Sequence, residues 1–158
     1  MARRSLRLLT VGRLRSPHWK AAAEHYQDRL KRWLDLREDC LADGAAALAP
    51  AARSVEESNR LLAALTPRDL LICLDERGAS YSSRDFAALL ARLGEDANRV
   101  PCFVVGGAFG LSEAVRGQAR HIIAFGPLTL PHELARVVLL EQIYRAECIN
   151  RKVPYHHD

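Results

Sequence analysis

Short apolar runs alternate along the chain with stretches in which apolar residues recur every three or four positions. Runs of the first kind predict buried strands, and stretches of the second kind predict helices with one apolar face. The strands predicted in this way are 5–11, 36–42, 69–74, 100–105 and 121–125. The predicted helices are 18–33, about 54–65, 82–93, a short helix from about 112, and 131–149. This alternation predicts the α/β class.

Three of the predicted strands are apolar without interruption, namely 69–74, 100–105 and 121–125. Continuous apolar runs are typical of strands covered on both faces, so they predict a mainly parallel sheet flanked by helices. In open α/β sheets of this kind, ligands bind beyond the carboxyl ends of the strands. We therefore expect the loops that follow these three strands to converge on one site.

Local signals set several of the predicted boundaries. Ser54 and Glu57 have the capping-box spacing S-x-x-E and predict the start of the second helix, after a loop over 44–52. The sequence Asp-Glu-Arg-Gly at 75–78 predicts a turn at the end of the third strand. Pro131 suits the first turn of the last helix, where its missing N–H costs little.

The composition fits one compact domain over residues 1–158, because 49% of these 158 residues are hydrophobic. The apolar run at 6–11 is short and interrupted by Arg7, so it predicts neither a signal peptide nor a membrane span. We therefore expect a cytoplasmic protein. The four cysteines lack CxxC spacing and predict reduced, buried side chains, with no metal site and no disulfide.

Positive charge is concentrated near the start of the chain, although the net charge is only +4. Residues 1–40 hold ten Lys or Arg and five acidic residues, so the rest of the chain is close to neutral. A basic face of this kind indicates a phosphate-rich partner, since neutralised phosphates release counterions. A solvated surface kept soluble by its charge is the alternative, and basicity alone does not distinguish RNA from DNA.

Two loops at the predicted site have unusual composition. The spacing Gly106-Gly107-x-x-Gly110 lets backbone approach a ligand closely, but it is not the GxGxxG of dinucleotide-binding proteins, and a tight strand-to-helix turn would also explain it. The segment 126–130 is apolar where loops are usually polar. It indicates either a flat apolar ligand or a loop packed against the sheet.

Four segments together resemble a known family, and the resemblance extends over the whole chain, including the strand end at 8–12. They are Gly106-Gly107-Ala108-Phe109-Gly110-Leu111, Leu128-Thr129-Leu130-Pro131-His132, Tyr144-Arg145-Ala146 and Pro154-Tyr155-His156. In these segments the chain is similar to the bacterial 23S ribosomal RNA pseudouridine N3-methyltransferases of the SPOUT superfamily.

The resemblance implies a SPOUT fold with a deep C-terminal trefoil knot, with the knot and cofactor site in roughly residues 70–158, and a homodimer. It also implies that the cofactor is S-adenosyl-L-methionine. The residues expected to bind it are Leu74, Gly106, Gly107, Gly126, Pro127, Leu128, Thr129, Leu130 and Pro131. The implied substrate is a pseudouridine of 23S rRNA in the stem-loop that faces the small subunit (helix 69), on the assembled ribosome.

The same resemblance leads to a set of candidate catalytic residues, which are His132, Glu141, Arg145, Tyr155 and His156. The imide nitrogen of pseudouridine must lose its proton before it can accept a methyl group. Arg145 is expected to orient a phosphate or stabilise the imide anion, and His132, Tyr155 or His156 to accept the proton or stack on the base.

Each of these candidates also has a simpler structural role open to it. Glu141 and Arg145 have the spacing of an ordinary helical ion pair. His132 could be a surface residue at a helix start, and the tail that holds Tyr155 and His156 could be a frayed terminus. The tail looks too polar to pack within its own domain, so we expect it to complete the pocket of the neighbouring subunit.

Two departures from the family pattern bear on these expectations. Ala108-Phe109 replaces a common Pro-Glu pair, which puts an acidic contact to the cofactor in doubt, and His157-Asp158 replaces a common basic residue. A titrating His157 predicts RNA affinity that weakens above neutral pH. A SPOUT methyltransferase acting on a different RNA, such as tRNA, and a non-catalytic RNA-binding module are the alternative functions.

Overall fold

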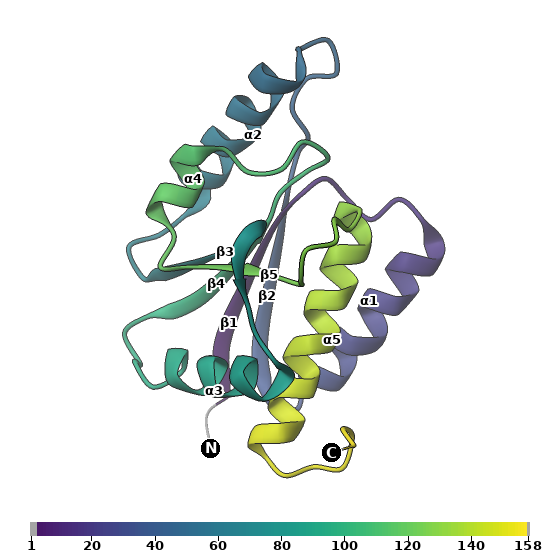
Figure 1. The fold of residues 1–158 in the computed structure, drawn as a ribbon, viewed down its shortest axis with the longest axis vertical. Helices are drawn as coiled ribbons and strands as arrows, with labels where there is room; N and C mark the ends of the chain where they lie inside the picture. The colour runs from purple at the N-terminus through teal and green to yellow at the C-terminus, as the bar shows by residue number, and fades with distance from the viewer. Residues whose placement is uncertain (1–2, 158) are drawn as a thin grey trace.

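The computed structural model describes residues 3–157 (Figure 1). Strands and helices alternate along this part of the chain. The strands are β1 (Arg4–Val11), β2 (Leu34–Leu41), β3 (Asp69–Ser80), β4 (Val100–Val105) and β5 (His121–Ala124). The helices are α1 (Pro17–Leu30), α2 (Pro50–Ala64), α3 (Ser83–Leu93), α4 (Glu113–Gln118) and α5 (His132–Asn150).

The strands form one five-stranded sheet in the order β2-β1-β4-β3-β5, and every pairing in it is parallel. The predicted α/β class with a mainly parallel sheet is therefore confirmed. In a parallel sheet all strands run toward the same edge, so residues 74–77 of β3 and the loops after β4 and β5 lie side by side there.

Helices cover both faces of the sheet, and the apolar runs in the sequence are explained by this arrangement (Figure 1). Successive residues of a strand point to opposite faces. Leu8 and Phe103 pack with α1, α3 and α5 in one buried cluster, whereas Leu9 and Val104 pack with α2 and α4 in the other. All four of these side chains are fully buried.

The predicted start of α2 is wrong, because the helix begins at Pro50 and the supposed capping box lies inside it. Proline fits the first helical position and fixes φ there, so Ala49 serves as the N-cap without a side-chain hydrogen bond. Glu57 is instead buried, and its Oε1 accepts a hydrogen bond from the backbone N–H of Gly44 at 2.9 Å.

The predicted turn at 75–78 is also wrong, since β3 continues to Ser80 with a register shift between Leu74 and Ala79. Both of these residues pair with Ile123, so residues 75–78 bulge out of the ladder before the parallel pairing with β5 resumes. A Cβ atom built on Gly78 would lie 2.5 Å from the carbonyl carbon of Ile122, so only glycine permits this approach. The trefoil knot stays a prediction.

Three smaller expectations also need correction. Helix α1 ends at Leu30, and Trp33 lies beyond it, where its ring stacks on Tyr144 with centroids 5.7 Å apart. Pro131 is the N-cap of α5 and precedes its first turn. Cys40 is exposed, unlike the other cysteines, and its thiol donates a hydrogen bond to the carbonyl of Gly12.

Candidate functional site

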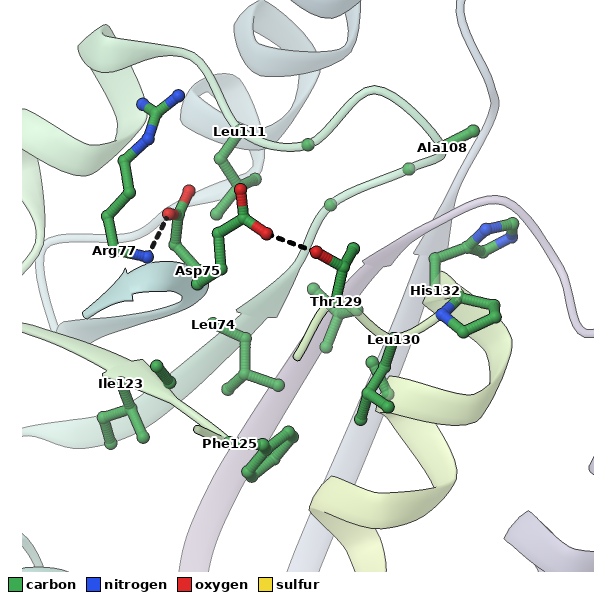
Figure 2. Close-up of a pocket in the computed structure, with 18 of the residues that line it drawn as sticks. Leu74, Asp75, Arg77, Ala108, Leu111, Ile123, Phe125, Thr129, Leu130 and His132 are labelled. Carbon is green, nitrogen blue, oxygen red and sulfur yellow. Dashed lines mark hydrogen bonds between the residues drawn. The ribbon is translucent and has the colours of Figure 1, made fainter. Parts of the chain in front are cut away.

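A cavity of about 720 Å³ opens at the carboxyl edge of the sheet, between residues 74–77 of β3 and the loops that follow β4 and β5 (Figure 2). The segments after Leu74, Val105 and Phe125 converge on one site as predicted, although the first of them belongs to β3. Eight of the nine residues predicted to bind the cofactor line it, and Pro127 does not. The eight are Leu74, Gly106, Gly107, Gly126, Leu128, Thr129, Leu130 and Pro131.

The walls of the cavity differ in character. Leu74, Phe125 and Leu130 form an apolar side, as Figure 2 shows. Asp75 and Glu76, on the extension of β3, add two carboxylates to the lining. A flat apolar group and a positively charged group could therefore both be accommodated in one ligand.

Helix α2 packs against the side of the glycine loop that faces away from the cavity. Gly106 and Gly107 are buried, and a Cβ atom built on Gly107 would lie 2.9 Å from Glu57 Oε2 and 3.2 Å from Val11 Cγ1. At the far end of the loop the backbone N–H of Ser112 donates to Ser58 Oγ at 3.3 Å. The backbone can therefore lie between the cavity and α2 only if position 107 has no side chain.

Polar links between the loops involve three residues that were not among the predicted cofactor-binding residues, namely Asp75, Glu76 and Arg116. Arg116 lines the cavity 3.5 Å from Asp75 Oδ2, and it also donates to the carbonyl of Leu111. Thr129 Oγ1 donates to Glu76 Oε2 at 2.6 Å across the cavity (Figure 2). The two acids come directly after a buried strand, a position that could have revealed them, but the sequence around them favours a turn. Nothing in the sequence pattern points to Arg116.

Of the five catalytic candidates, only His132 lines the cavity. It lies at the first position of α5, next to the apolar loop. Glu141 and Arg145 lie farther along that helix as an ion pair of 2.7 Å, the simpler arrangement their spacing allows. The Glu141 carboxylate raises the pKa of Arg145, against the opposing effect of burial, so this cation stays charged. A single chain therefore does not bring all five candidates to the cavity.

The C-terminal tail packs on its own chain, so the expectation that it is too polar to do so is wrong. The Tyr155 ring meets the Tyr144 ring edge-on with centroids 4.7 Å apart, and its hydroxyl donates to Glu141 Oε1 at 3.2 Å. Arg145 lies 5.0 Å from the centroid of the same ring. Burial raises the pKa of Tyr155, and Tyr26 and Glu141 raise it further, so the phenol is protonated at neutral pH.

His156 follows in the tail and is half-buried, and His157 is exposed. Asp158 lies outside the described residues. In Figure 1 the tail lies near the end of α5 that is remote from the cavity.

Part of the N-terminal positive charge has a structural role. Arg7 is buried and pairs with Asp69 at 2.6 Å and with Asp39 at 2.9 Å, while Arg4 pairs with the fully buried Glu147. Several other N-terminal cations are exposed, and the guanidinium of Arg32 lies 3.9 Å from the centroid of the Trp33 ring. The basic surface available to a partner is therefore smaller than the sequence indicates.

Neither a metal site nor a membrane span is found within residues 3–157. No group of three or more His, Cys, Asp or Glu side chains there could hold a metal ion. None of the helices in this described range is long and apolar enough to cross a membrane.

The parallel sheet, the glycine loop and the cavity at the carboxyl edge define an α/β protein with a ligand site at the ends of its central strands. A solved structure with this fold is a probable methyltransferase from Bordetella pertussis Tohama I, with a TM-score of 0.55 and 16% identity over 91% of this chain and 94% of that one. The likeness shows the fold. The chain belongs to the SPOUT methyltransferase family, whose model, described as a predicted SPOUT methyltransferase, matches residues 5–156.

Relatives that share most of the sequence have a more particular name. A protein of Nitratidesulfovibrio vulgaris (strain DSM 19637 / Miyazaki F) is 57% identical over 98% of this chain and 99% of its own length. One from Oleidesulfovibrio alaskensis (strain ATCC BAA-1058 / DSM 17464 / G20) is 53% identical over the same shares. Both are named ribosomal RNA large subunit methyltransferase H.

Proposed function

We propose that this protein transfers a methyl group from S-adenosyl-L-methionine to the ribosomal RNA of the large subunit. The observation that carries the proposal is the cavity at the carboxyl edge of the sheet, in a chain of the SPOUT methyltransferase family. Its 57% identical relative is named for that RNA, and the two sequences match over nearly their full lengths.

The cavity residues suit this cofactor. The volume of about 720 Å³ is within the range of sites for ligands of this size. Leu74, Phe125 and Leu130 would hold the adenine ring, and the carboxylate of Asp75 would face the positively charged end. When bound, the cofactor supplies a methyl group already activated by its sulfonium. The protein therefore has to bind, orient and deprotonate the acceptor.

The finer target we propose is N3 of a pseudouridine in helix 69, the stem-loop that faces the small subunit, on the assembled ribosome. The N3–H must lose its proton to a base, after which the nitrogen electron pair forms the N–C bond while the C–S bond breaks toward sulfur. His132, which lines the cavity, would accept the proton. Tyr155, protonated at neutral pH, suits stacking on the base better than proton transfer.

We further propose that the active form is a homodimer in which each tail completes the cavity of the other copy. Only His132 among the five candidates lines the cavity of its own chain. Glu141 and Arg145 are held with Tyr155 in one packed unit, so a second copy could present these residues and His156 together. An enzyme acting on ribosomes in this way would work in the cytoplasm, as a single domain.

The test uses purified protein, radiolabelled S-adenosyl-L-methionine and ribosomes that lack this methyl group. Intact ribosomes, free large-subunit RNA and tRNA are compared as substrates, and labelled fragments are mapped by nuclease digestion and mass spectrometry. We expect label on one pseudouridine of the intact ribosome. Label on tRNA instead would refute the proposed substrate, and cofactor binding without transfer to any RNA would favour a binding module.

A further inference from the structure

An exposed aromatic side chain stands at the mouth of the cavity. Phe109 follows Ala108 in the outer part of the glycine loop, beyond the buried Gly106 and Gly107. The residue is 46% exposed, and it is one of four large exposed hydrophobic residues in the described part of the chain. Its position on the loop and its place in the cavity lining make it different from a scattered surface residue.

Arg53 of α2 lies against this ring. Its guanidinium carbon is 5.4 Å from the Phe109 centroid, and its Nε is 3.5 Å from Oε1 of the buried Glu57. That Nε is buried and makes no hydrogen bond to the described residues. Glu57 therefore lies at one edge of the guanidinium group while the planar group stays beside the ring. A cation held in this way adds positive charge to an aromatic surface.

A second exposed apolar side chain lies on another loop at the same cavity. Leu128 is 78% exposed and also belongs to the lining, and its neighbour Thr129 is tied to Glu76 by a hydrogen bond of 2.6 Å. The loops that hold Phe109 and Leu128 are thus both anchored while these side chains remain in solvent. The mouth of the cavity can therefore bind a flat apolar group.

We propose that Phe109 and Arg53 form a stacking platform for a nucleobase of the RNA substrate at the mouth of the cavity. The inference deepens the proposed function and rests on it for the identity of the RNA. Unstacked RNA bases bind proteins by stacking on aromatic rings and on arginine planes. Arg53 adds a positive charge that attracts the phosphate of the same nucleotide.

The test compares Phe109→Ala, Phe109→Leu and Phe109→Trp with the wild-type protein. Methyl transfer to ribosomes gives KM and kcat, calorimetry gives the Kd for S-adenosyl-L-methionine, and sedimentation gives the oligomeric state. We expect Phe109→Ala to raise KM for the RNA about 5- to 150-fold, the cost of one lost base stack. Phe109→Trp should stay near wild type, and Phe109→Leu should resemble the alanine variant.

A matched control is Val55→Ala, which removes an exposed apolar side chain from the same helix as Arg53. Val55 is outside the cavity lining, so this variant should keep wild-type constants. Arg53→Gln should raise KM for the RNA in the same direction as Phe109→Ala. Equal KM values for the alanine and wild-type proteins, or a leucine variant as good as tryptophan, would overturn the platform.

Two further measurements separate base stacking from a role of Phe109 in cofactor binding or subunit contact. A weaker Kd for the cofactor or a shift in oligomeric state for Phe109→Ala would assign the side chain to one of those roles instead. Equilibrium binding of large-subunit RNA, measured without turnover, tests the platform even if the wild type transfers no methyl group. Unchanged RNA binding in Phe109→Ala would refute it, whereas absent turnover by the wild type would refute only the proposed function.

Discussion

Gly107 shows how one missing side chain shapes the site. A methyl group there would meet the buried Glu57 carboxylate at 2.9 Å and Val11 at 3.2 Å, so the loop would have to move toward the cavity. We expect Gly107→Ala to weaken cofactor binding at least tenfold and to lower the free energy of unfolding by about 1–3 kcal/mol, as overpacking does. Calorimetry and urea unfolding measure the two effects.

The control is Gly117→Ala in α4, where a built Cβ atom has no neighbour within 4 Å. Alanine is the better helix former, so this variant should gain up to about 1 kcal/mol and bind cofactor normally. Equal cofactor affinity in Gly107→Ala and wild type would show that the loop adapts without cost.

Asp39 predicts how stability depends on pH. Burial acts to raise its pKa, but hydrogen bonds from Arg7 and Arg37 outweigh that effect and lower the pKa below its ordinary value. The folded state therefore binds fewer protons than the unfolded chain, and the stabilisation is present above about pH 4 and lost as the pH falls through the folded pKa.

We expect Asp39→Asn to lower the free energy of unfolding at neutral pH by about 1 kcal/mol or more, because Arg7 loses a charged partner. The difference from wild type should shrink below about pH 4. Urea unfolding at several pH values checks this, with Asp35→Asn as control, since Asp35 is exposed and makes no ion pair within residues 3–157. A difference that persists in acid would assign the effect to packing.

At the scale of elements, every strand was predicted, and the clearest signals were the continuous apolar runs of strands that are buried on both faces. The errors arose where a neighbour decides the structure. Residues 75–78 look like a turn by themselves, but they lie within β3 as an irregularity between Leu74 and Ala79, both of which pair with β5. Likewise, Tyr155 contacts Tyr144 and Glu141 on α5. Contacts of this kind between separate segments cannot be predicted from the tail sequence alone.

The candidate site was also predicted only in part. The residues at strand ends were found, since a parallel sheet collects them at one edge. Arg116 was missed because it reaches the cavity from α4. Its partner Asp75 is far away in the sequence, so no local pattern indicates their contact.

The tail is an element whose removal separates two functions. Val153 and Tyr155 of the tail pack on the core that includes α5, and residues 153–157 do not line the cavity. A chain truncated after Lys152 should therefore fold and bind S-adenosyl-L-methionine normally. It should transfer no methyl group if the tail serves the reaction. Calorimetry and the ribosome assay measure both properties, and lost cofactor affinity would show that the tail supports the cavity of its own chain.

For the whole molecule, the proposed dimer predicts complementation between two inactive variants. Gly107→Ala lacks a working cavity but keeps its tail, and the truncated chain keeps its cavity. If each tail acts on the other copy, an equal mixture refolded together should recover about a quarter of wild-type activity. Half of the dimers are then mixed, and each of these has one complete site of two. No recovery in a mixture shown to contain mixed dimers would place the tail on its own cavity.

The buried cysteines make opening of the folded molecule measurable by chemistry. Burial raises the pKa of Cys73 in β3 and of Cys102 in β4 to about 12, and Cys148 is enclosed within α5. A thiol reagent should therefore modify Cys40 at once and the other three only when their segments detach. Mass spectrometry of the labelled peptides would give the labelling rates of Cys73 and Cys102 in the sheet separately from that of Cys148 in α5. Bound cofactor should slow labelling of Cys73, which immediately precedes the cavity residue Leu74.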